Sequence, residues 1–108
     1  MSQHMDALAR ANAIRFGIAA VKREVKAGTL TVADALLDER AQPMKLGALL
    51  LAQWRWGPDR VRLLCGHMLI SEVRRVRDLT TRQRGEIAWR LDQEYPLDGT
   101  ESSTEKAA

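Results

Sequence analysis

Residues 43–68 read PMKLGALLLAQWRWGPDRVRLLCGHM and contain the signals that decide the fold. Apolar residues recur three or four positions apart on both sides of the tryptophan-rich break at 54–57, which is the spacing of two short amphipathic helices. Pro43 and Pro58 each suit a first helical turn, where the missing amide costs no hydrogen bond. We therefore expect one helix over 43–53 and a second over 58–68.

Helical periodicity continues upstream of this pair. Apolar residues at the same spacing, Leu8 and Ile14 among them, predict one apolar stripe on a long helix from Met5 to Ala27, and Gly28 ends it. Thr31 predicts the cap of a short helix that ends near Arg40.

Downstream, Thr80 and Gln83 have the spacing of a capping box. They predict a last helix through Tyr95, which Pro96 ends. No strand pattern occurs anywhere in the sequence. We therefore expect an all-α fold, a small bundle of about five helices with a long N-terminal helix.

The length of 108 residues fits one small domain. We expect a single helical domain over residues 6–96, preceded by a flexible N-terminus over 1–5. Residues 97–108 are polar, acidic and without periodicity, so they are predicted to form a disordered tail that could compete for a basic surface.

The charge is unevenly distributed along the chain. The whole chain carries +3, but residues 10–90 hold sixteen basic and eight acidic side chains, a net charge of +8. Thirteen of the seventeen cations are arginine, whose planar guanidinium suits phosphate, although a high-GC genome also raises arginine usage. The balance favours a partner that is a polyanion.

The residues that catalysis or metal binding requires do not form a set. The chain offers only His4, His67 and Cys65, and the last two lie on different faces of one helix. Cys65 sits in an apolar stretch and is interpreted as a buried structural thiol. We expect no enzyme, cofactor or metal. The absence of a leader and of a long apolar run predicts a cytoplasmic protein without a membrane segment.

The strongest functional signal is a run of arginines between residues 55 and 84, where eight arginines accompany three acids. Arg74, Arg75 and Arg77 lie in a loop just before a capped helix, where guanidinium groups and backbone amides suit a row of phosphates. The alternative is a solvated loop whose arginines pair with Glu72 and Asp78. The candidate DNA-binding residues are Arg74, Arg75, Arg77, Gly57, Arg60, Arg62, Arg82 and Arg84.

Gly57 stands in the turn between the two central helices, where a residue without a side chain lets a phosphate approach the backbone. Trp54 and Trp56 beside it could stack on nucleic acid, but packing is the favoured interpretation. Trp89 is also predicted to pack.

Several stretches together resemble actinobacterial (mycobacterial and streptomycete) integration host factor. They are PMKLGALL at 43–50, Gly57, ISEVRRVRDL at 70–79 and RQR at 82–84. The similarity runs from Met44 to about Leu91, and the basic stretch KREVKAG at 22–28 resembles the long basic helix of that family.

The resemblance implies a helix-two-turns-helix unit at about 44–79 and a function without catalysis. Members of that family are nucleoid-associated proteins that bind double-stranded DNA through its backbone, bend or compact it, and assist phage integrases. Their DNA-contacting arginines fall on Arg74, Arg75 and Arg77, and their turn glycine on Gly57. We accordingly expect a monomer that associates with the nucleoid.

This chain departs from the family pattern at two places. Pro58 stands where the family has lysine, so Arg60 or Arg62 is proposed to supply the missing charge. Asp78 stands where the family usually has glycine, and it is expected to compete for an arginine. Two other classes remain open: a helical protein-interaction adaptor or transcriptional regulator that does not rely on DNA backbone binding, and a glycosylase-like enzyme, which the missing N-terminal proline disfavours.

Overall fold

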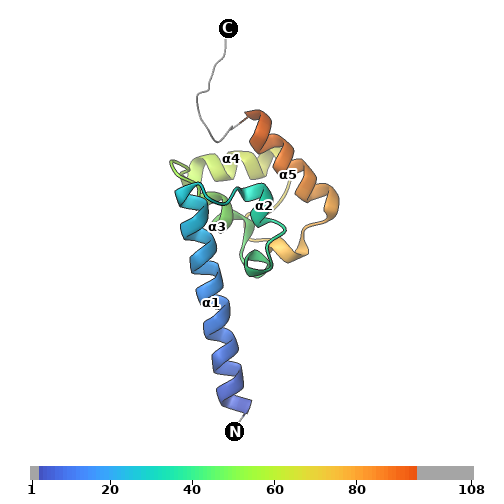
Figure 1. The fold of residues 1–108 in the computed structure, drawn as a ribbon. Coiled ribbons are helices and arrows are strands. Elements are labelled where there is room, and N and C mark those ends of the chain that lie inside the picture. The colour runs from blue at the N-terminus through green and yellow to red at the C-terminus, as the bar shows by residue number, and fades with distance from the viewer. Residues whose placement is uncertain (1–2, 95–108) are drawn as a thin grey trace.

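The computed structural model describes residues 3–94, and this part of the chain is helical (Figure 1). Its α-helices are α1 (Gln3–Ala27), α2 (Val32–Ala35), α3 (Leu46–Leu51), α4 (Pro58–Met68) and α5 (Thr81–Glu94), with 3-10 turns η1 (Glu39–Ala41) and η2 (Val76–Asp78). The predicted all-α bundle of five helices with a long N-terminal helix is confirmed. Residues 3–5, predicted as part of a flexible N-terminus, form the first turn of α1, and the predicted tail at 97–108 lies outside the described residues.

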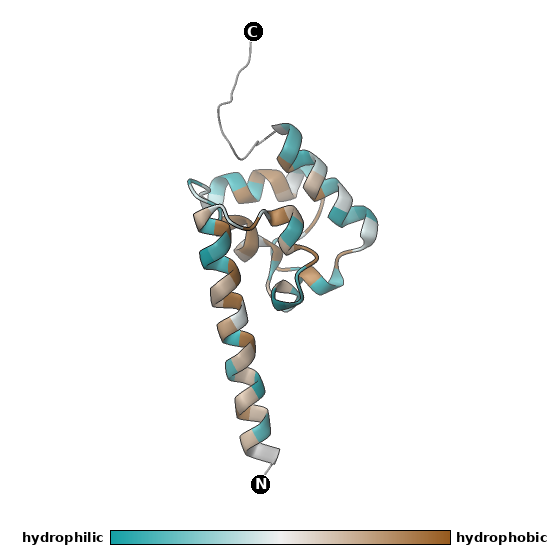
Figure 2. Cartoon of the chain, viewed as in Figure 1, coloured by the Kyte–Doolittle hydropathy of each residue, from teal (hydrophilic) through white to brown (hydrophobic). Residues whose placement is uncertain are grey.

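Helix α1 packs on the domain only through its C-terminal half. Val21 and Val25 are buried, and Gly28 ends the helix with a φ of +82°, which favours glycine. The N-terminal half projects away from the other helices (Figure 1), and hydrophobic colour continues along it (Figure 2). Leu8 and Ile14, both on the predicted apolar stripe, are exposed, and Ile14 lines a hollow between α1 and η1.

The short helix predicted after Thr31 is divided in two. The Thr31 hydroxyl accepts a hydrogen bond from the Asp34 amide at 3.1 Å and caps α2, as predicted. Helix α2 ends at Ala35, and a second cap, Asp38, then begins η1 by accepting from the Arg40 amide at 2.8 Å. The extra cap explains why the helix does not continue to Arg40.

Pro43 does not begin a helix, which corrects the prediction for 43–53. Residues 42–44 form a turn that leads to the extended Lys45, and the segment pairs with 74–77 through hydrogen bonds from the Val76 amide to the Met44 carbonyl (2.8 Å) and from the Arg77 amide to the Gln42 carbonyl (3.0 Å). Helix α3 starts only after this pairing, with Lys45 as its N-cap. Tertiary hydrogen bonds therefore take precedence over the local signal of the proline.

Gly47 marks the closest approach in this pairing. Its amide donates to the Glu72 carbonyl at 2.8 Å. A Cβ at position 47 would lie 3.1 Å from both the carbonyl oxygen and the Cβ of Glu72. A glycine here lets the backbone of the loop after α4 pack directly on α3.

Helices α4 and α5 follow the sequence prediction closely. Pro58 is the first residue of α4, Met68 its last, and Leu69 closes it in the left-handed region at φ 57°. The Thr80 amide donates to the Gln83 side chain at 2.9 Å and the Gln83 amide to the Thr80 hydroxyl at 3.0 Å, so the predicted capping box is present.

One hydrophobic core joins all five helices. Cys65 belongs to it and is 3% exposed, and burial, with the charge of Glu72 as a smaller cause, raises the pKa of its thiol to about 11. The largest fully buried side chains are Leu36, Leu46, Leu49, Leu50, Leu64, Ile87, Val21, Val32, Val61 and Val76. The interpretation of Cys65 as a structural thiol is confirmed.

Candidate nucleic-acid interface

The arginine loop is anchored to the start of α3 rather than free. Lys45 and Arg75 form an antiparallel bridge, and the Leu46 amide donates to the Arg74 carbonyl at 2.8 Å. Met44 and Val76 point into the core, so the alternate residues Lys45 and Arg75 are on the outside and exposed. The pairing thus holds cations from two distant segments side by side.

The three arginines of the loop do not pair with the acids beside them within the described residues. Arg74 donates to the backbone carbonyl of Asp78 at 3.2 Å, not to its carboxylate. Arg75 donates to the Pro43 carbonyl at 2.6 Å. Each guanidinium has five donors, so most of them stay available to a ligand. The expected competition from the Asp78 carboxylate is not seen.

A shallow groove of about 240 Å³ lies between this bridge and the first turn of α4. Its walls come from α3, from α4 and from the loop at 72–73, and Glu72 is the one acid among them. The lining residues are Lys45, Gly47, Ala48, Leu51, Pro58, Val61, Glu72 and Val73.

A second groove of about 330 Å³ continues from the first across the exposed side of α3. Ala48 and Leu51 line both grooves, so the two are adjacent. The C-terminal half of α1 forms the far wall of this groove, and the turn after α3 closes one end of it. The remaining lining residues are Lys22, Lys26, Ala52, Gln53, Trp54 and Arg55.

The two grooves and the arginine loop together define a surface that we call the basic face. Its cations are Lys22, Lys26, Lys45, Arg55, Arg74 and Arg75. The sequence-based set contained only the last two. Arg15, Lys22 and Lys26 are spaced by whole helical turns and so share a side of α1, which is the signal that could have identified the lysines.

The other predicted DNA-binding residues near the turn, Gly57, Arg60 and Arg62, do not line either groove. Gly57 is the N-cap of α4 at φ −104°, and a Cβ there would meet nothing within 4 Å, so the space above it is open. Arg60 lies over the Trp56 ring at 5.4 Å, and Arg62 pairs with Asp59 at 2.9 Å. Because both side chains of the latter pair are largely exposed, the ion pair is weak and exchangeable.

Besides Arg60 and Arg62, three predicted arginines lie outside the basic face. Arg77 is exposed in a separate hollow between η1 and α1, and Arg82 is exposed in the first turn of α5. Arg84 is half-buried and donates to the carbonyls of Leu36 and Val76, the latter at 2.9 Å. It also donates to the Gln42 side chain at 3.2 Å. The guanidinium of Arg84 therefore holds α5 on the domain, and its role as a phosphate ligand stays a prediction.

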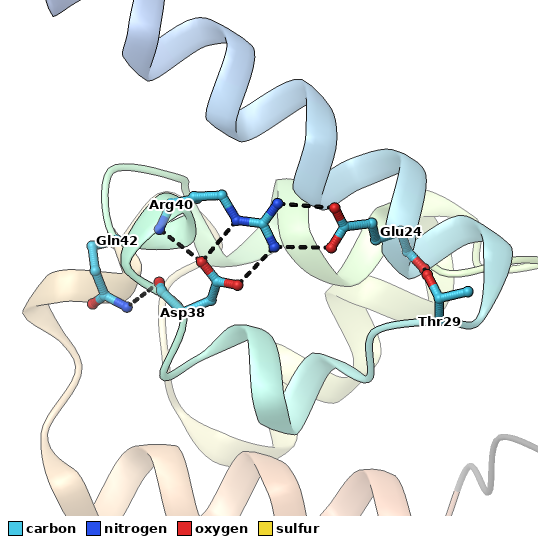
Figure 3. Close-up of polar contacts among 5 residues, drawn as sticks. All are labelled: Glu24, Thr29, Asp38, Arg40 and Gln42. Carbon is cyan, nitrogen blue, oxygen red and sulfur yellow. Dashed lines mark hydrogen bonds and ion pairs between the residues drawn. The ribbon is translucent and has the colours of Figure 1, made fainter.

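Arg40 fixes the position of α1, and hence of its lysines, relative to the domain. Its guanidinium donates to both carboxylate oxygens of Glu24 at 2.8 and 2.9 Å and to those of Asp38 at 3.0 and 2.8 Å (Figure 3). These hydrogen bonds lower the pKa of both carboxyl groups and raise the pKa of Arg40. The bidentate geometry suits arginine and not lysine.

The three tryptophans differ in their surroundings. Trp56 packs against the core, as predicted. Trp54 and Trp89, also predicted to pack, are 65% and 60% exposed. Neither wrong prediction could be avoided from spacing alone, because within residues 3–94 no element covers the turn after α3 or the outer side of α5.

No three His, Cys, Asp or Glu side chains between residues 3 and 94 are placed to hold a metal ion. In the same part of the chain, no helix combines the length and the apolar composition that a membrane span requires.

A solved structure of sIHF bound to an 8-base-pair palindromic DNA is similar to this chain, with a TM-score of 0.69 and 27% sequence identity. The match covers 75% of this chain and 96% of the sIHF chain. No protein-family model matches the sequence, and no curated protein is similar to it. The chain therefore has the fold of sIHF. This likeness supports the resemblance to integration host factor at the level of the fold.

Proposed function

We propose that this chain binds double-stranded DNA through the sugar-phosphate backbone, as an architectural protein with little sequence preference. One observation carries the proposal: two adjacent grooves on α3 are lined by four cations, Lys22, Lys26, Lys45 and Arg55, with Glu72 as the one acid in their walls, and the bridge between Lys45 and Arg75 joins the arginine loop to them. Backbone contacts made by lysine and arginine position a protein on DNA without reading its sequence.

The likeness to sIHF, which is bound to DNA in its solved structure, supports the same conclusion. From the resemblance we further propose that the chain bends or compacts DNA, associates with the nucleoid in the cytoplasm and assists a phage integrase. We propose that it does so as a monomer, without a catalytic step or a cofactor.

The test is a titration of two short duplexes of unrelated sequence with the wild type and with the double variant Lys22→Gln/Lys26→Gln. Neutralising two phosphate contacts should weaken binding to both duplexes to the same extent. Arg82→Gln is the matched control, because that arginine is exposed but lies outside the basic face, and it should change affinity less. Equal affinity of the double variant and the wild type would refute this role of the face. Energy transfer between dyes on the duplex ends measures bending.

A helical protein-interaction adaptor is the second candidate, and one observation favours it. The projecting half of α1 exposes Met5, Leu8, Ile14 and Phe16, whose exposed fractions range from 47% to 72%. Exposed apolar side chains in a group often mark protein interaction sites. An adaptor that does not rely on DNA would show no salt-dependent affinity for either duplex.

A further inference from the structure

Trp54 is an exposed aromatic side chain in the wall of the basic face. It is 65% exposed and lines the same groove as Lys22 and Lys26. The guanidinium of Arg55 lies 4.5 Å from the centroid of its ring. One cation therefore lies over the indole in a cation–π contact, and two more line the same groove.

The backbone of the turn presents Trp54 outward. Trp56 packs on the core, whereas Arg55 between the two adopts a φ of 68°, a left-handed conformation that costs a non-glycine residue about 1–2 kcal/mol. Such conformations persist where the surroundings fix them, and they are frequent at ligand sites. Here the conformation separates a tryptophan in the core from one at the surface.

The chemistry of the groove fits a nucleobase joined to phosphates. Bases stack on aromatic side chains whatever their sequence, because every base has a π face, and cations beside the ring hold the backbone that carries the base. The volume of about 330 Å³ is at the lower end of ligand sites, about 300–1,000 Å³. In an intact duplex the bases stack on each other, so only a base that has left the stack presents its face.

Trp89 shows that exposure alone does not make such a site. It is 60% exposed on α5, but Glu86 and Asp92, three residues away on either side, are its neighbours on the helix surface. Carboxylates repel a phosphate backbone, and although Glu86 pairs with Arg90, we expect this indole to be less suited to DNA than Trp54.

We propose that Trp54 is a base-stacking residue that recognises an unstacked base in double-stranded DNA, such as the extra base of a bulge. The inference rests on the proposed DNA binding and adds to it a preference for distorted duplexes over intact ones. Lys22, Lys26 and Arg55 hold the backbone on either side of that base.

The experiment compares a short intact duplex with the same duplex carrying one unpaired 2-aminopurine. Affinities are measured by anisotropy for the full chain, Trp54→Ala, Trp54→Phe and the matched control Trp89→Ala. Circular dichroism checks that each variant folds, which the exposure of both tryptophans favours.

We expect the wild type to bind the bulged duplex about 5- to 100-fold more tightly than the intact one, the range of a single stacked base. The preference and the quenching of 2-aminopurine should disappear in Trp54→Ala, be partly kept by Trp54→Phe and be unchanged in Trp89→Ala. Equal affinity of the wild type for both duplexes, or a preference that survives in Trp54→Ala, would overturn the stacking role alone. Absence of binding to either duplex would overturn the proposed function as well.

Discussion

Lys45 and Arg75 face each other across an antiparallel bridge, and both side chains are exposed. Like charges directly opposite on neighbouring segments destabilise their pairing. Two backbone hydrogen bonds flank the bridge and hold it together despite this cost, one from the Val76 amide to the Met44 carbonyl and one from the Leu46 amide to the Arg74 carbonyl. A phosphate between the two cations would remove the repulsion, so the arrangement is better suited to a bound anion than to the free protein.

The first prediction concerns this bridge. Lys45→Gln should weaken binding to every duplex and make the salt dependence shallower by about 0.9, the share of one phosphate contact. Stability should stay within about 0.5 kcal/mol of the wild type, because the side chain is exposed. Isothermal titration at several salt concentrations measures the affinity and its salt dependence, and urea unfolding measures the stability. Arg82→Gln is the control for both. An unchanged salt dependence would show that Lys45 meets no phosphate.

Arg84 should contribute to the stability of the fold. Arg84→Ala removes hydrogen bonds to the carbonyls of Leu36 and Val76, and each bond to a charged group contributes about 1.5–3 kcal/mol. Urea unfolding should show a loss of at least that size. Arg82→Ala, two residues earlier in the same helix and exposed, should leave the unfolding midpoint unchanged. A midpoint for Arg84→Ala equal to that of the wild type would contradict the structural role.

Gly47→Ala should loosen the contact between α3 and the loop that carries Glu72. The added Cβ would lie 3.1 Å from backbone and side-chain atoms of Glu72, and overpacking of this kind costs about 1–3 kcal/mol. Gly85→Ala is the control, because its Cβ would meet nothing within 4 Å and alanine favours a helix by about 0.5–1 kcal/mol. Thermal unfolding should therefore shift in opposite directions for the two variants.

The contacts of Arg40 predict a dependence of stability on pH. The pKa values of Glu24 and Asp38 are lowered in the folded chain, so their stabilisation is present above about pH 4, the pKa of unfolded carboxyls, and is lost as pH falls through the folded values. Arg40→Ala should lower the Tm at neutral pH, and the difference from the wild type should shrink in acid. Arg62→Ala, which removes an exposed pair with Asp59, should change the Tm little at any pH. A constant difference for Arg40→Ala from neutral to acid pH would rule out the ion pairs as its cause.

Local signals predicted the parts of the fold that local interactions determine. Pro58 at the start of α4 and the Thr80-Gln83 capping box have their predicted roles, because each acts within one helical turn. Pro43 was misassigned because its segment pairs with residues 74–77, more than thirty positions away. No local pattern reveals such a pairing.

The candidate site was predicted only in part for the same reason. Arg74 and Arg75 were found as a cluster of charge, whereas Lys22, Lys26 and Lys45 join them only through the packing of α1 and α3. Counting charges also cannot distinguish an arginine bonded inside the fold from one available to a ligand.

The most direct test of the central claim is fluorescence anisotropy of a labelled duplex of arbitrary sequence at a series of salt concentrations. If the basic face engages about four to six phosphates, the logarithm of the affinity should fall with the logarithm of salt at a slope of about −4 to −5. Unrelated sequences should give the same slope. A slope near zero, or no binding at low salt, would contradict backbone recognition by this face.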